Sequence, residues 1–174
     1  MLVDTPAPGR LDAEVHTDSE DLSDAVMGDL VKAILARVKK VDRDHDIPYI
    51  AGYSQSGEII YIDRDLPKSF LHDGKRVQID RFVVIHETIE KALLDELGLH
   101  YVHAHQAAMR VERGAVEAAG VSWSAYDRFT KERGKMIGDK RLTRVPPDLD
   151  LTPYRDEHDL KTLRQLIAGY SVEE

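Results

Sequence analysis

The sequence predicts an α+β fold in which a small β-sheet packs against several helices. Between residues 47 and 79, short runs rich in β-branched and aromatic residues are separated by turn residues, a pattern typical of strands. Before and after this section, over residues 21–41 and 82–135, apolar side chains recur every three or four positions, as in amphipathic helices. A chain of 174 residues has the size of one domain, so we expect these elements to share one core.

Charge and cysteine content narrow the functions that this domain can have. The net charge of −8 argues against a general nucleic-acid-binding protein, and the basic stretch 134–144 lacks interleaved aromatic residues. No run approaches the roughly 18 apolar residues of a membrane helix, and the first residues lack a signal-peptide pattern. We therefore expect a cytoplasmic protein without nucleic-acid or membrane partners. Because there is no cysteine, only His, Asp, Glu or water can hold a metal ion.

The first half of the chain contains an arm, a helix and a hairpin. Residues 1–20 are acidic with few apolar anchors, so we expect them to form a mobile arm. A helix is predicted over residues 21–41, where apolar side chains recur every four positions. Strands are predicted over 47–53 and 58–62, and residues 54–57 supply the turn between them.

A loop, a third strand and two long helices follow. Residues 68–74 are predicted to form a loop, and residues 75–79 a short strand of the same small sheet. The next helix covers 82–97 and ends at Gly98, the residue type that a left-handed helix cap favours. A second helix is predicted over 101–119.

The last part of the chain combines one more amphipathic helix with a C-terminal segment. The helix begins at Ser122 or Ser124, either of which can cap it. Three prolines predict an extended connector over 145–159, and a short helix over 160–170 closes the chain. The predicted parts are an arm over 1–20, an α+β domain over 21–144 and a C-terminal segment over 145–174.

The helix over 82–97 carries the first candidate site residues. His86 and Glu90 are four positions apart and therefore share a helix face, close to the predicted buried stripe. A carboxylate in that position is costly unless it is paired or bound to a cation, which predicts a metal ligand pair. The simpler interpretation is that His86 is a hydrogen-bonded core histidine and that Glu87 pairs with Lys91 on the helix surface.

The following helix can complete the ligand set. His105 and Glu112 are seven positions apart and so lie on one face. Zinc held by two imidazoles, one carboxylate and a water is an established catalytic arrangement, and the first helix supplies only one imidazole. We favour His105 as the second one, with Glu112 as a fourth ligand or as the partner of a ligand; His100 and His103 are alternatives. The expected cofactor is zinc or another divalent metal ion.

The stretch GEIIYIDRDLP, followed by a loop and an apolar run into His86-Glu87, resembles the minimal core of zincin-type metallopeptidases. The resemblance covers roughly residues 47–112. In that family a helix reading HExxH follows a small sheet whose edge strand binds extended substrate. The first His and the Glu correspond to His86 and Glu87, whereas Glu90 replaces the second His. The HE-x-x-E, Tyr, Ala-His and Glu layout also resembles uncharacterised bacterial and phage-related proteins, which implies no reaction.

The resemblance implies a mechanism and a third ligand. Gluzincins take a Glu from a following helix, a position that Glu112 matches, with His105 as the alternative. The implied function is a metal-dependent hydrolase, a small peptidase acting on a peptide or protein substrate. Glu87 is then the general base that deprotonates a metal-bound water, and Tyr101 or a neighbouring histidine steadies the oxyanion.

Two other functions fit the same residues. The first is a non-catalytic, metal-stabilised interaction protein on a zincin-like scaffold. The second is a carboxylate-rich helical metal protein of the ferritin type, since the acidic residues and His105 are spread over two helices. The ferritin-type alternative is disfavoured because it needs four long helices, and this chain has a β section.

Overall fold

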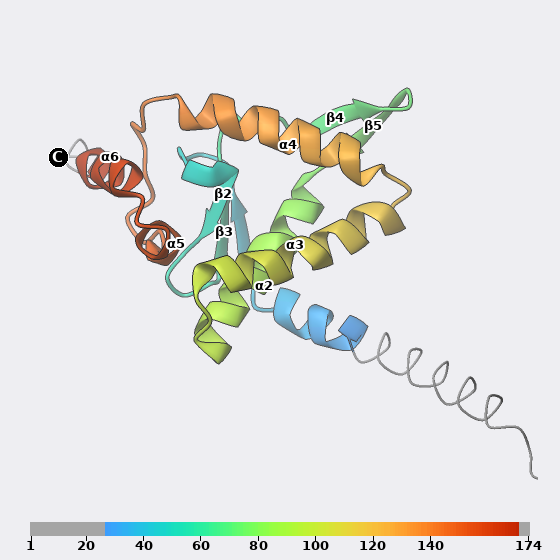
Figure 1. Ribbon diagram of the computed structural model, residues 1–174, viewed down its shortest axis with the longest axis horizontal. Helices are drawn as coiled ribbons and strands as arrows, with labels where there is room; N and C mark the ends of the chain where they lie inside the picture. Colours follow the sequence, from blue (N-terminus) through green and yellow to red (C-terminus); the bar gives the residue numbers. More distant parts are fainter. Residues whose placement is uncertain (1–26, 171–174) are drawn as a thin grey trace, which may run out of the picture. The chain divides into compact units, whose positions relative to one another are not determined.

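The computed structural model describes residues 27–170 (Figure 1). The arm predicted over 1–20, the start of the first predicted helix and the last four residues lie outside this range. The chain divides between Ala33 and Ile34, and the fold described below is that of the part from Ile34 onward. It combines helices with two small sheets, which confirms the predicted α+β class.

A three-stranded sheet forms the centre of the fold. It consists of β1 (Lys40–Asp42), β2 (Ala51–Tyr53) and β3 (Ile59–Ile62), in the order β1-β3-β2. The middle strand β3 runs parallel to β1 and antiparallel to β2. Ile60 and Ile62 are fully buried, as expected for β-branched residues on the central strand.

The helix predicted over residues 21–41 is too long. Its described part ends at Leu35, and β1 begins only five residues later. The backbone N–H of Lys39 donates to the carbonyl of Glu58 at 2.7 Å, so the chain leaves the helix in order to pair with β3. Apolar residues keep their helical spacing through this stretch. The chain is nevertheless extended there, because it pairs with β3.

The strand predicted over residues 47–53 is correct only in its second half. Its first half is a short 3-10 turn, η1 (Pro48–Ile50), because proline has no N–H to donate to a ladder. Tyr49 and Ile50 have φ values of 60° and 70°. Such a value is costly for Ile50 in particular, because its side chain is β-branched. This left-handed pair turns the chain immediately before β2.

The loop predicted over residues 68–74 is wrong. Most of it is β4 (Ser69–His72), which forms a hairpin with β5 (Lys75–Gln78). Asp73 and Gly74 connect the two strands with φ values of 48° and 74°, as a two-residue primed turn requires. The predicted third strand therefore exists, but it belongs to a separate two-stranded sheet and not to the central one.

Three long helices follow close to their predicted positions: α2 (Asp80–Leu97), α3 (Tyr101–Ala118) and α4 (Trp123–Gly138). Gly98 ends α2 in the left-handed conformation, with a φ of 59°. Of the two predicted caps of α4, Ser122 takes the role, and its hydroxyl accepts a backbone hydrogen bond from the first turn. Among the described residues, no helix combines the length and the apolar character that crossing a membrane requires.

The C-terminal segment is less extended than predicted. Within residues 145–159 it forms the short helix α5 (Thr152–Asp156), with Pro153 in the first turn, where a missing N–H is tolerated. The predicted final helix is present as α6 (Leu160–Tyr170). Tyr154 of α5 and Leu166 of α6 are buried in a second apolar cluster together with Ile47 and Tyr61.

Helix α2 has a central place in the packing. It contacts β2, β3 and α3, so several of its faces are covered (Figure 1). The main apolar cluster joins residues of the sheet to residues of α2, α3 and α4, among them Ile60, Ile62, Phe82, Val83, Val116 and Tyr126. Any polar side chain on the covered faces of α2 must therefore find a partner inside the protein.

Candidate metal centre

Helix α2 buries three titratable side chains in one turn. His86, Glu87 and Glu90 are only 6%, 7% and 2% exposed. An isolated buried charge is strongly unfavourable, so these groups must be paired, neutral or bound to a cation. Their burial excludes the interpretation of Glu87 as a solvated residue of the helix surface.

Helix α3 brings one histidine to this group and keeps two others away. Ala104 and Ala108 are fully buried, and such small side chains let α3 lie close to α2. His105 points from α3 towards His86, and the two rings are 4.7 Å apart, centre to centre. The sequence alternatives His100 and His103 are exposed.

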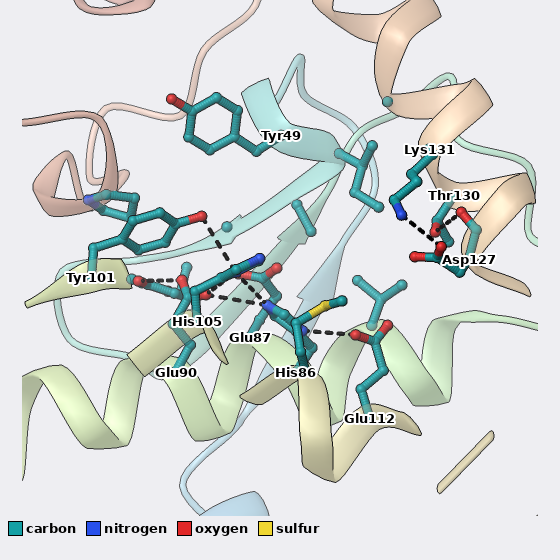
Figure 2. Close-up of a pocket in the computed structure, with 18 of the residues that line it drawn as sticks. Tyr49, His86, Glu87, Glu90, Tyr101, His105, Glu112, Asp127, Thr130 and Lys131 are labelled. Atoms are coloured by element: carbon teal, nitrogen blue, oxygen red, sulfur yellow. Dashed lines mark hydrogen bonds and ion pairs between the residues drawn. The ribbon is translucent and has the colours of Figure 1, made fainter. Parts of the chain in front are cut away.

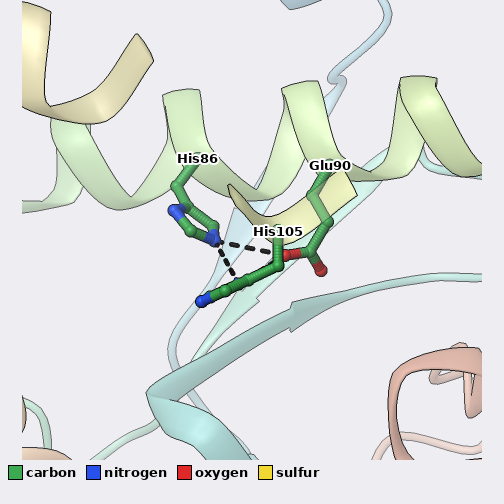
Figure 3. A group of neighbouring side chains, drawn as sticks. All are labelled: His86, Glu90 and His105. Carbon is green, nitrogen blue, oxygen red and sulfur yellow. Dashed lines mark hydrogen bonds and ion pairs between the residues drawn. The ribbon is translucent and has the colours of Figure 1, made fainter. Parts of the chain in front are cut away.

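Three ligand atoms converge on one point (Figure 3). His86 Nε2 lies 3.2 Å from Glu90 Oε2 and 3.1 Å from His105 Nδ1, and the last two atoms are 2.9 Å apart. Ligands of a tetrahedral zinc ion at about 2.0–2.1 Å are separated by about 3.3 Å, which these distances approach. His86, Glu90 and His105 could therefore hold a metal ion.

Glu112 lies on the other side of the His86 ring and is not one of the three converging groups. Its Oε2 is 2.8 Å from His86 Nδ1, and its Oε1 accepts a hydrogen bond from the Tyr126 hydroxyl at 2.6 Å. Burial opposes the charged form of His86, but the hydrogen bonds to Glu112 and Glu90 outweigh it and raise the pKa of His86 well above its usual value. Glu112 is thus placed to orient the His86 ring for metal binding.

Glu90 is held as a carboxylate from both of its oxygens. Oε2 faces the two imidazoles, while Oε1 accepts a hydrogen bond from the Tyr53 hydroxyl at 2.8 Å. Burial opposes ionisation, but the hydrogen bonds from His105 and His86 prevail and lower the pKa of Glu90. A charged oxygen is consequently available to a cation at this point.

The carboxylate of Glu87 differs from its neighbours. No described residue donates a hydrogen bond to it, and its oxygens are not fully buried but reach the same cavity (Figure 2). Burial raises the pKa of Glu87 well above its usual value, and the charge of Glu90 adds to the effect. The expected surface partner Lys91 instead binds Asp95 at 2.9 Å and Asp150 at 2.8 Å.

The cluster opens into a cavity of about 360 Å³. Its walls come from η1, β2 and helices α2 to α5, and they are mostly apolar or aromatic. The Tyr101 hydroxyl, a residue named from the sequence, lies at the wall 3.4 Å from His105 Nδ1. Figure 2 shows that Tyr49 and Lys131 lie across the cavity from the cluster. The aromatic lining residues are Tyr49, Tyr53, Tyr101, Trp123, Tyr126 and Tyr154.

Two residues of the site were not identified from the sequence. The Tyr53 hydroxyl, from β2, donates a hydrogen bond to Glu90 Oε1. The Tyr126 hydroxyl, from α4, donates one to Glu112 Oε1. In the sequence, Tyr53 lies in a predicted strand and Tyr126 in a predicted helix, and no motif contains either of them. A buried tyrosine needs a partner for its hydroxyl, yet sequence spacing does not say which carboxylate supplies it.

Comparison of the chain with protein-family models, with curated proteins and with solved structures gives no match. The resemblance to zincin-type metallopeptidases therefore stays a prediction. What the site can do follows from its own groups: three convergent ligand atoms, a buried carboxylate beside them and an apolar cavity.

Proposed function

We propose that this protein is a metal-dependent hydrolase of amide bonds in which Glu87 is the general base. The observation that carries the proposal is the position of Glu87. Its carboxylate adjoins the group of three ligand atoms, lines the cavity, and is engaged by no hydrogen bond from a described residue. A purely structural metal site does not require a carboxylate that faces the cavity beside the ligands with no hydrogen bond from a described residue.

The three ligand residues fit a catalytic rather than a closed site. Two imidazoles and one carboxylate form a three-ligand set of the kind that leaves a fourth position for water or substrate. Zinc or another divalent ion bound there would polarise a substrate carbonyl and promote attack by water. The absence of cysteine excludes the four-thiolate pattern of many structural zinc sites.

The residues of the chain can perform the proton transfers of hydrolysis. Glu87 accepts a proton from the attacking water as the new carbon–oxygen bond forms. It then delivers the proton to the leaving nitrogen, and the carbon–nitrogen bond breaks as the carbonyl re-forms. The Tyr101 hydroxyl lies at the wall beside His105 and can donate a hydrogen bond to the developing oxyanion. The preference for amide bonds follows the resemblance to metallopeptidases.

The test replaces Glu87 by glutamine, which keeps the size of the side chain but removes its basicity. The matched control is Glu96→Gln, on the same helix, where the side chain is exposed and pairs with Arg37. Metal content is measured together with cleavage of a mixed library of short amides and peptides. We expect Glu87→Gln to retain metal and to lose about 10²–10⁴-fold in rate.

The control should behave as the unchanged protein. Equal cleavage by metal-loaded Glu87→Gln protein would remove Glu87 from the mechanism. No cleavage by the unchanged, metal-loaded protein would favour the non-catalytic, metal-stabilised interaction protein.

A further inference from the structure

The chain itself closes the outer edge of β2 at its Tyr53 end. β2 lies at the edge of the central sheet, where an extended peptide can add as a further strand. Residues 147–150, here called the strap, already pair with this edge. Asp150 N–H donates to the carbonyl of Tyr53 at 2.9 Å, and Gln55 N–H donates to the carbonyl of Asp148 at 2.8 Å.

The strap is anchored by its side chains as well as by its backbone. Leu149 is 1% exposed and packs in the second apolar cluster. The Tyr61 hydroxyl donates to the carboxylate of Asp148, and Lys91 binds Asp150 at 2.8 Å. A peptide that added along the whole of β2 would have to displace the strap at Tyr53, because the Tyr53 carbonyl is already engaged.

The remaining charges at the cavity wall are also engaged. Lys131 pairs with Asp127 at 2.7 Å, and Asp150 pairs with Lys91. Away from His86, Glu87, Glu90, His105 and Glu112, the described wall therefore offers mainly aromatic and aliphatic side chains, with Thr130 as a neutral polar residue, and no unpaired charge. Such a surface favours an uncharged apolar or aromatic group.

We infer that the substrate is a compact amide whose single apolar or aromatic group fills the cavity, and not an extended polypeptide bound along β2. The assignment of this occupant as a substrate rests on the proposed function. The cavity volume of about 360 Å³ lies at the small end of the range for ligand pockets, which suits a group of this size. Hydrolysis adds water across the amide bond and releases a carboxylic acid and an amine.

Occupancy of the cavity can be measured without turnover. Trp123 is the single tryptophan of the chain and lines the cavity, so its fluorescence reports a ligand there. The compact probe is N-acetylphenylalanine amide, and the extended probe is a capped hexapeptide with the same phenylalanine at its centre. Both are titrated into the protein with and without zinc. We expect the compact probe to bind and the hexapeptide to bind no tighter.

Gly134 provides a variant that fills the cavity. It lines the wall in α4, and a Cβ added there would meet Ile50 Cγ2 at 3.4 Å. Gly134→Leu is expected to weaken binding of the compact probe by about tenfold or more. Gly138→Leu is the matched control on the same helix, since a Cβ at that position meets no atom within 4 Å. Gly134→Ala replaces the leucine variant if the latter unfolds.

Three results would overturn the inference. They are a hexapeptide that binds at least tenfold tighter than the compact probe, a compact probe that does not bind, and equal binding by the Gly134 and Gly138 variants. The binding measurement requires neither hydrolysis nor bound metal. It therefore tests the inference about the ligand even if the protein has no hydrolase activity. The inference is supported if the compact probe binds more weakly to the Gly134 variant but not to the Gly138 variant, and if the hexapeptide binds no tighter than the compact probe.

Discussion

Glu112 holds His86 by the ring nitrogen that faces away from the candidate metal group. The Oε2 atom of Glu112 lies 2.8 Å from His86 Nδ1, while His86 Nε2 lies 3.1 Å from His105 Nδ1. A carboxylate on one nitrogen keeps a proton there and leaves the lone pair of the other nitrogen for a cation. The contact thus fixes both the orientation and the tautomer that metal binding by His86 needs.

Replacement of Glu112 by glutamine tests this relationship. The amide keeps the shape of the side chain but removes the charge that stabilises the proton on Nδ1. We expect zinc affinity, measured by competition with a chelator, to fall about 10–100-fold. Glu117→Gln is the control on the same helix, because Glu117 is exposed and pairs only with Arg113 among the described residues. Unchanged affinity in the Glu112 variant would contradict the orienting role.

Tyr53 should contribute through the oxygen of Glu90 that faces away from the cluster. Tyr53→Phe removes the 2.8 Å hydrogen bond to Glu90 Oε1 and leaves the packing of the ring intact. We expect zinc affinity to fall by up to about tenfold, since outer partners of metal ligands commonly have effects of this size. Tyr49→Phe is the control, because Tyr49 lines the same cavity but donates to Asp159. Equal affinities in both variants would exclude the role of Tyr53.

Asp46 should make folding stability depend on pH at the acidic end. Burial opposes its ionisation, but hydrogen bonds from the backbone of Thr143 and Arg144 and an ion pair with Lys140 lower the pKa of Asp46 from 3.8 to about 2. Because the pKa is depressed in the folded state, the stabilisation is full above about pH 4 and disappears as the pH falls towards about 2. The shift corresponds to about 2 kcal/mol at neutral pH.

The matching measurement is urea unfolding of Asp46→Asn protein at several pH values. At pH 7 the variant should be less stable than the unchanged protein by about 2 kcal/mol or more. The difference should shrink between pH 4 and pH 2. Asp44→Asn is the control, since Asp44 is exposed in the same turn and should show little difference at any pH. A constant difference for the Asp46 variant across this range would contradict the account.

The residues that share a helix could be placed from the sequence. His86 and Glu90 are one turn apart, and the regular geometry of α2 fixes their common direction. His105 and Glu112 occupy one face of α3 for the same reason, and both contact His86 in the structure. The predicted α+β class is confirmed as well, because periodicity and turn residues report helices and strands separately.

Features that depend on contacts between distant parts of the chain could not be predicted from the sequence. β1 continued an apolar helical period, and only its pairing with β3 shows that it is a strand. The hydrogen bonds of Tyr53 and Tyr126 join elements far apart in the chain, so no spacing rule identifies them. β4 is different, because the Asp73-Gly74 pair after it is a recognised hairpin signal, so this strand could have been predicted from the sequence.

Whether His86, Glu90 and His105 bind a metal ion is decided by elemental analysis of protein purified without chelator or added metal. We predict about one divalent metal ion per chain, and loss of that ion in His86→Ala, Glu90→Ala and His105→Ala proteins that remain folded. His100→Ala and His103→Ala, which change exposed histidines on the same part of the chain, should keep it. Protein that contains no metal and takes up none from added zinc, or a His105→Ala protein with full metal content, would contradict the assignment.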